Sequence, residues 1–169
     1  EFMGDMPELT ADFSHVSYLS LTGNTAISAT SPFLQRFPNL RHLGLRSFAL
    51  EQIPQAITHM PELNTLILND CGVAMNHASQ TALSSLSNLD TLELTNSPLG
   101  EAPDITALPA LNYINLSNTR ISHIPVGLVE HPNISTAIFN GNLITELPET
   151  VFTLPANRSD GFELADNPL

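Results

Sequence analysis

The chain has 169 residues, 42% of them hydrophobic, which is enough for one domain with a substantial core. Five arginines, no lysine and seventeen acidic residues give a net charge of −12, which disfavours a phosphate backbone or an anionic membrane as partner and favours a basic protein surface. The acidity could equally serve only to keep the chain in solution. A single cysteine excludes an internal disulfide and favours a reducing compartment such as the cytosol.

The first residues are read as two short segments. Glu1 and Phe2 resemble the remnant of a cloning site before Met3, so we expect residues 1–3 to be foreign to the natural protein. Residues 4–15 are expected to form a lead-in to a repeat that fills residues 16–169. A signal sequence removed upstream remains an open alternative.

One apolar pattern recurs through the rest of the chain and fits the template L-x-x-L-x-L-x-x-N-x-L. Its copies start at positions 16, 40, 63, 89, 111, 134 and 159, so the intervals run from 22 to 26 residues. The copies comprise six full repeats and a truncated seventh. This period and template are those of leucine-rich repeats, and seven copies in register make the match specific.

The template predicts an α/β solenoid. Residues of each L-x-L unit alternate between two faces, as in a short strand, and one unit cannot bury its own leucines. Stacked copies form a continuous apolar ladder, in which each buried leucine contributes roughly 1.5–3 kcal/mol. We therefore expect a curved right-handed superhelix with a parallel sheet on its concave face and short helices or 3-10 turns on its convex face.

Proline residues recur in the segments that return from one strand to the next. Pro54, Pro125 and Pro148 suit the first position of a helical turn. We expect helical turns over residues 55–59, 126–130 and 149–154. Residues 76–86 predict a true α-helix with Asn76 as its N-cap.

The asparagine position of the template lies where the chain leaves the strand. Its amide can satisfy backbone groups of adjacent turns at Asn24, Asn142 and Asn167, and in part at Cys71, Ser97 and Thr119. Phe48 cannot do so, which predicts a local irregularity. The motif explains Cys71 as a buried structural thiol rather than a nucleophile.

No residue pattern in the chain predicts catalysis. The six histidines form no metal-binding spacing and are interpreted as solvated turn residues, and neither a phosphate loop nor a G-x-S-x-G elbow is present. We expect no metal and no cofactor, and the chain itself is not expected to be an enzyme. A hidden hydrolase or metalloenzyme is the weakest of the hypotheses.

The outward strand positions are the candidate binding surface. They form three columns across the sheet and include exposed aromatic, aliphatic and arginine side chains, which are favoured anchors in protein interfaces. The alternative is a merely solvated face with binding at an edge or on the convex side. The candidate residues on the concave face are Tyr18, His42, Arg46, Ile67, Asn69, Glu93, Thr95, Tyr113, Asn115, Ile138 and Asn140.

The sequence stops inside the seventh repeat, where no polar end cap is visible. From this we expect a piece of a longer protein, monomeric but able to associate end to end through its last strand.

Four stretches carry a closer resemblance: LRHLGLRSFALEQIP, LNTLILNDCGVAMNHASQTALSSLSNLDTLELTNSPLG, LNYINLSNTRISHIP and ELADNPL. They resemble the leucine-rich repeats of bacterial effectors that carry a NEL-type (novel E3 ligase) ubiquitin-ligase domain. The resemblance implies a substrate-recognition region, secretion into the host cytoplasm, and a catalytic cysteine beyond Leu169 rather than at Cys71. The alternative is a stand-alone cytoplasmic scaffold or adaptor without an attached enzyme.

Overall fold

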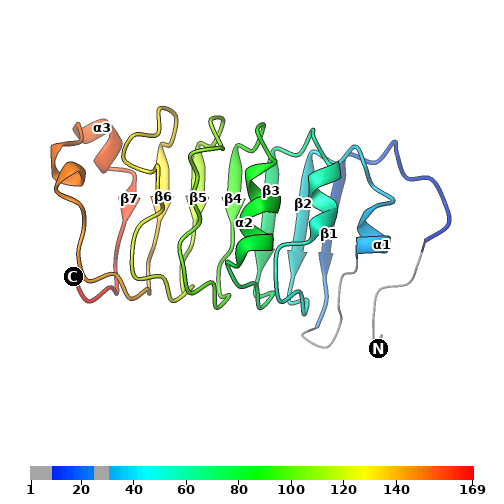
Figure 1. Cartoon of the computed structure of the whole chain (residues 1–169), viewed down its shortest axis with the longest axis horizontal. Helices are drawn as coiled ribbons and strands as arrows, with labels where there is room; N and C mark the ends of the chain where they lie inside the picture. Colours follow the sequence, from blue (N-terminus) through cyan, green and yellow to red (C-terminus); the bar gives the residue numbers. More distant parts are fainter. Residues whose placement is uncertain (1–8, 25–30) are drawn as a thin grey trace.

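A computed structural model describes residues 9–24 and 31–169, so the expected cloning remnant and the start of the lead-in lie outside the described residues. Each repeat contributes one strand to a single parallel sheet, and the strand order follows the chain (Figure 1). The strands are β1 (Tyr18–Thr22), β2 (His42–Arg46), β3 (Thr65–Asn69), β4 (Thr91–Glu93), β5 (Tyr113–Asn115), β6 (Thr136–Ile138) and β7 (Phe162–Glu163).

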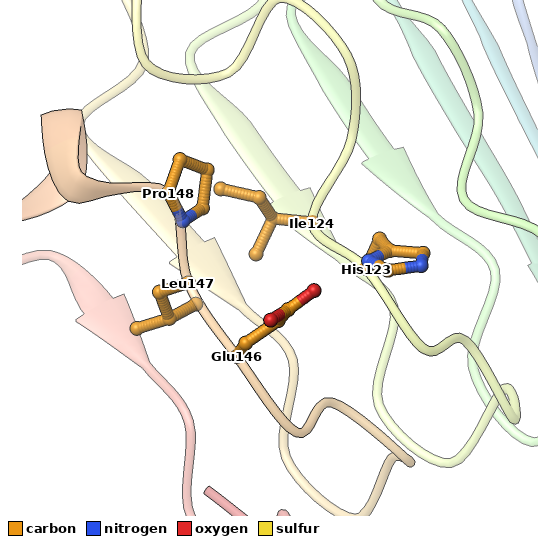
Figure 2. A pocket seen from close by; sticks show the side chains of 5 residues that line it. All are labelled: His123, Ile124, Glu146, Leu147 and Pro148. Atoms are coloured by element: carbon orange, nitrogen blue, oxygen red, sulfur yellow. The ribbon is translucent and has the colours of Figure 1, made fainter.

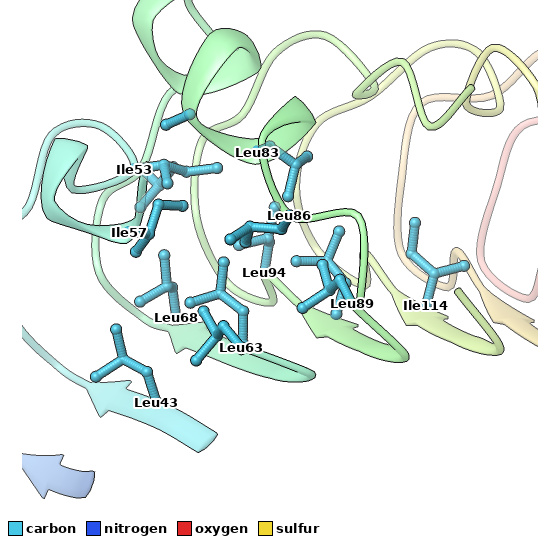
Figure 3. Packing of buried hydrophobic residues seen from close by; sticks show 14 of the residues in the cluster. Leu43, Ile53, Ile57, Leu63, Leu68, Leu83, Leu86, Leu89, Leu94 and Ile114 are labelled. Carbon is cyan, nitrogen blue, oxygen red and sulfur yellow. The ribbon is translucent and has the colours of Figure 1, made fainter. Parts of the chain in front are cut away.

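The inward strand positions form the apolar ladder that the template predicts. Leu66 is paired with Leu92 in the next strand, Leu92 with Ile114, and none of the three side chains is exposed. Side chains from the return segments close the other side of this core, among them Ile57 and Leu83 (Figure 3). The one-strand-per-repeat solenoid expected from the period is therefore confirmed.

The return segments hold the helical elements, which are α1 (Ser31–Leu34), η1 (Gln55–His59), α2 (His77–Ser84), η2 (Glu149–Thr153) and α3 (Ala156–Ser159). Asn76 caps α2 as expected, because its Oδ1 accepts a hydrogen bond of 2.8 Å from the Ser79 N–H. The helix ends at Ser84, two residues before the predicted end.

Residues 126–130 form a turn and not the predicted helical segment. Gly127 has a φ of +90°, a value that a right-handed helix cannot contain. The short helices α1 and α3 were not predicted, since four residues carry no periodicity that a sequence pattern can reveal.

Asn142 performs the role expected at the turn position. Its Oδ1 accepts from the backbone N–H of Thr119 at 2.9 Å, and its Nδ2 donates to the carbonyls of Leu116 and Phe139 at 2.8 and 2.9 Å. The irregularity expected at Phe48 does not reach the sheet, because β1 and β2 pair over five residues. The ring fills the position instead: a Cβ at Gly23 would lie 2.9 Å from it.

Candidate protein-binding surface

The register places the predicted outward residues in columns across one side of the sheet, here called the sheet face. The first column runs from Tyr18 through His42, Thr65 and Thr91 to Tyr113, and the middle column from Ser20 through Gly44, Ile67 and Glu93 to Asn115. Because β4 to β7 end early, Thr95 and Asn140 lie just beyond the ordered strands. The third column is therefore a true strand position only in β1 to β3.

An aromatic pair stands at the N-terminal end of the sheet face. The rings of Tyr18 and His42 stack with their centroids 4.1 Å apart and their planes at 12°, and Tyr18 is 62% exposed. Burial lowers the pKa of the His42 imidazole. Arg46, exposed at the other end of β2, forms no hydrogen bond through its side chain and no ion pair with residues 9–24 or 31–169.

Gly44 lies between the aromatic pair and Arg46 and is itself buried. A Cβ added there would lie 3.3 Å from both His42 Nε2 and Ser20 Oγ, which is tighter than ordinary van der Waals contact. The side chains of Ser20 and His42 therefore cover Gly44.

Asn69 departs from the expectation of a solvent-facing binding residue, because it is only 6% exposed. Its Nδ2 donates to Glu93 Oε2 at 2.8 Å, and its Oδ1 accepts from the Thr95 N–H at 3.0 Å. The hydrogen bonds of the Asn69 side chain thus join the third repeat to the fourth. What it offers a partner is the fixed carboxylate of Glu93.

The same arrangement recurs three repeats later. Asn140 Nδ2 donates to Glu163 Oε2 at 3.0 Å, and its Oδ1 accepts from the Ala165 N–H at 2.9 Å. Glu163 was not among the predicted site residues, although it occupies the middle column exactly as Glu93 does. The recurring Asn-to-Glu interval of 23 or 24 residues was the signal that could have revealed it.

The central part of the sheet face is amphipathic. Asn115 Oδ1 accepts from the Ser117 N–H and Oγ at 3.0 and 2.7 Å, and its Nδ2 approaches the Tyr113 hydroxyl at 3.4 Å. Ile67 and Ile138 are partly buried rather than fully exposed. This region therefore presents apolar edges among side chains whose polar atoms are already engaged with each other.

Charge is divided unevenly along the chain. Residues 13–50 contain three arginines and no acidic residue, whereas residues 51–169 contain thirteen acidic residues and two arginines. Residues 13–50 therefore carry a net positive charge in a chain that is acidic overall. The total charge of −12 does not reveal this division.

Histidines lie in two different environments. His131 contradicts the interpretation as a solvated turn residue: it is 4% exposed, its Nε2 lies 2.7 Å from the Leu108 carbonyl, and its Nδ1 accepts from the N–H groups of Asn133 and Ile134. His123 is exposed and lines a pocket of about 340 Å³ with Glu146 between the fifth and sixth return segments (Figure 2). The pocket keeps the alternative of binding at an edge or on the convex side open.

Within the described ranges, no three histidine, cysteine, aspartate or glutamate side chains are grouped so that they could hold a metal ion. Among these same residues, no helix has the length and apolar character needed to cross a membrane. Cys71 is fully buried, and its Sγ lies 3.4 and 3.3 Å from the carbonyls of Leu45 and Asn69. Burial raises the pKa of this thiol, as expected for a structural cysteine.

No known family profile matches the chain. Among curated proteins it is similar to leucine-rich repeat and WD repeat-containing protein 1 of Xenopus tropicalis, 28% identical over 93 residues, which are 55% of this chain and 13% of that protein. It is also similar to leucine-rich repeat-containing G-protein coupled receptor 5 of Xenopus tropicalis, 29% identical over 118 residues, or 68% of this chain and 13% of the receptor. A third relative is the transforming growth factor beta activator LRRC33 of Danio rerio, 29% identical over 120 residues, or 67% of this chain and 17% of that protein.

Two solved structures share the fold. A leucine-rich-repeat protein of Leptospira interrogans superposes with a TM-score of 0.67 at 20% identity, covering 92% of this chain and 44% of that one. A chain of the Drosophila Toll–Spatzle complex superposes with a TM-score of 0.55 at 15% identity, covering 92% of this chain and 27% of its own length. The chain thus spans only a small part of the curated relatives and less than half of these structural neighbours.

Proposed function

Since this chain is a leucine-rich-repeat solenoid, we propose that it is a protein-recognition module that holds its partner against the sheet face. The observation that carries the proposal is the fixed placement of the carboxylates of Glu93 and Glu163 by Asn69 and Asn140. A side chain that is already held in place loses little conformational entropy when a partner binds to it. One structural neighbour belongs to the Toll–Spatzle complex, which supports a protein as the class of partner.

The chemistry of the face favours a partner that is basic over most of the interface. Glu93 and Glu163 offer oxygen acceptors, and the partly buried Ile67 and Ile138 offer apolar area between them. Carboxylates rigidly held by hydrogen bonds pair well with arginine. We infer a monomer in solution.

A photo-crosslinking experiment tests the sheet face as the binding site. A benzophenone amino acid is placed either at Ile67 on the sheet face or at the 63% exposed Val126 in a return segment. We expect the partner to be captured at residue 67 and not at residue 126. Capture at residue 126 alone would move the site to the convex side.

A pair of substitutions then measures the contribution of the face. With the captured partner purified, Tyr113→Ala combined with Glu93→Gln should weaken binding by at least about tenfold, because the pair removes an aromatic contact and one of the two carboxylates offered to a basic partner. His123→Ala is the matched control in the return-segment pocket. Unchanged affinity in the folded double variant would contradict the proposal.

We further propose that the module selects substrates for a NEL-type ubiquitin ligase secreted by a bacterium into the host cytoplasm. The four stretches that resemble such effectors support this, and the lack of lysine suits a module held beside a ubiquitin-loaded cysteine. The parent gene should then encode a cysteine-containing domain after Leu169 that discharges ubiquitin. A gene that instead encodes only an end cap would favour the cytoplasmic scaffold or adaptor.

A further inference from the structure

We propose that Asn140 and Gly141 form a self-modification site. Deamidation of Asn140 is held back while the seventh repeat is docked on the sixth and, once it has occurred, prevents the repeat from docking again. The inference goes beyond the proposed function and does not depend on it. These two residues are the one place in the sequence where glycine follows asparagine. They lie just after β6, at the junction with β7 (Figure 1).

The reaction needs only the chain itself and water. The backbone nitrogen of Gly141 attacks Cγ of Asn140, the Cγ–Nδ2 bond breaks, and ammonia leaves with the proton of the Gly141 nitrogen. The cyclic imide that remains takes up one water, which opens either of its two C–N bonds and gives aspartate or isoaspartate. Glycine has no Cβ, so the attack meets less hindrance here than at an asparagine followed by a larger residue.

Three hydrogen bonds hold the reacting groups in the docked state. The attacking N–H of Gly141 donates to the Ala165 carbonyl at 2.9 Å. The Asn140 amide is held at both ends, because its Nδ2 donates to Glu163 Oε2 at 3.0 Å and its Oδ1 accepts from the Ala165 N–H at 2.9 Å. All the partners lie within residues 163–165, so undocking of this one stretch frees the nucleophile and the amide together.

The seventh repeat is weakly held. Among residues 145–169, all of which the structure describes, none is buried, whereas Leu66, Leu92 and Ile114 in the middle of the sheet are fully buried. The strand β7 has only two residues. A segment with few buried contacts opens at a small cost in free energy, so the fraction of undocked chain sets the rate of modification.

Either product removes contacts that dock the seventh repeat. Aspartate has no N–H to donate to Glu163, and it places a second carboxylate beside the first. Isoaspartate also inserts a methylene carbon into the backbone between residues 140 and 141. This insertion moves Gly141 from the Ala165 carbonyl and displaces Asn142, whose amide joins the fifth and sixth repeats. Since the ammonia is lost, the amide does not form again and the change is one-way.

The rate of modification tests the control by the seventh repeat. The chain is incubated at mildly alkaline pH, either native or unfolded in guanidinium chloride, and is then digested with trypsin. Because the chain has no lysine, cleavage after Arg120 and Arg158 gives residues 121–158 as one peptide. Fragmentation in a mass spectrometer distinguishes its four asparagines, so the three others serve as internal controls for Asn140.

Asn167→Ala loosens the seventh repeat without changing the reacting residues. The Asn167 amide accepts from the Ile144 N–H at 3.0 Å and donates to the Phe139 carbonyl at 2.9 Å, both in the sixth repeat. Asn88→Ala is the matched control, because it removes an amide that donates to the Pro61 carbonyl between two other repeats.

We expect Asn140 to be modified before the other asparagines of the peptide. Its native rate should be at least about tenfold below its unfolded rate, because only the undocked fraction reacts. Asn167→Ala should raise the native rate about five- to tenfold and leave the unfolded rate unchanged, and Asn88→Ala should change neither. A native rate equal to the unfolded rate, or one that Asn167→Ala does not raise, would overturn the proposal.

Hydrogen exchange tests whether docking is lost after modification. The N–H groups of Phe139 and Gly141 donate to the carbonyls of Glu163 and Ala165, so their exchange reports the docking of the seventh repeat. In the modified chain, separated by its added negative charge, both should exchange at least about tenfold faster. The N–H of Leu94, which is bonded to the fifth repeat, is the control and should keep its rate. Unchanged exchange at Phe139 and Gly141 would show that the repeat docks again and would overturn the one-way change.

Discussion

Asn69 and Glu93 are joined across the third and fourth repeats by a hydrogen bond of 2.8 Å from the amide to the carboxylate. The Oδ1 of the same amide accepts the Thr95 N–H, so one nearly buried side chain is bonded to two residues of the next repeat, Glu93 and Thr95. This arrangement fixes a charged group of the sheet face, where we propose that a partner binds, and the same residue links the two repeats.

We expect Asn69→Ala to lower the free energy of unfolding by about 1–3 kcal/mol, because it leaves the Thr95 N–H and the Glu93 carboxylate without their partner. Asn140→Ala, at the equivalent but less buried position, should cost less. Urea unfolding followed by circular dichroism measures both. Equal costs at the two positions would show that burial does not set the strength of this link.

His131 gives a second stability prediction. His131→Phe replaces the imidazole with an apolar phenyl ring and removes contacts to one carbonyl and two N–H groups, so we expect a loss of about 2–4 kcal/mol. His123→Phe, on an exposed ring, is the control and should change stability by no more than about 0.5 kcal/mol. A similar small effect at both positions would mean that the hydrogen bonds of His131 contribute little.

The period of the sequence was sufficient to predict the ladder, because alternation along each strand decides which leucines are buried. It could not predict the role of Asn69, which depends on β4 ending at Glu93 and leaving the Thr95 N–H free to find another acceptor. The burial of His131 likewise depends on contacts across 23 residues, and a histidine beside a proline carries no local sign of them. Contacts between return segments are thus the part of the fold that the pattern leaves undetermined.

Gly141 allows steric and conformational costs to be separated. It has a φ of +68°, and a Cβ there would collide with Asn118 Oδ1. We expect Gly141→Ala to cost about 1–3 kcal/mol in the wild type and about 1 kcal/mol in an Asn118→Ala background, where only the left-handed backbone penalty remains. A double-mutant cycle by urea unfolding measures the difference, and equal costs in the two backgrounds would exclude the collision as the cause.

The Tyr18–His42 pair makes stability depend on pH. Burial lowers the pKa of His42 from its ordinary value of 6.5, so the unfolded chain binds this proton more tightly than the folded chain. The contribution is complete above the ordinary value and is lost as pH falls through the lowered pKa. Between about pH 7 and 5, wild type should therefore lose more stability than His42→Phe, measured by urea unfolding at each pH. A smaller loss in wild type would contradict this direction.

Cys71 provides a chemical measure of how tightly the repeats are closed. The thiol is fully buried and burial raises its pKa, so it lacks both the access and the thiolate that a disulfide reagent needs. At about pH 8 the Cys71 thiol of the native chain should react only as fast as local unfolding exposes it. In the unfolded chain the same thiol should react much faster. Because Cys71 is the single cysteine, the absorbance of the released thiolate reports this one site.

Asn69→Ala should speed the native reaction, since it loosens the repeat that follows the thiol, and Glu62→Gln should leave it unchanged. A native rate equal to the unfolded rate would mean that the third and fourth repeats do not enclose the thiol.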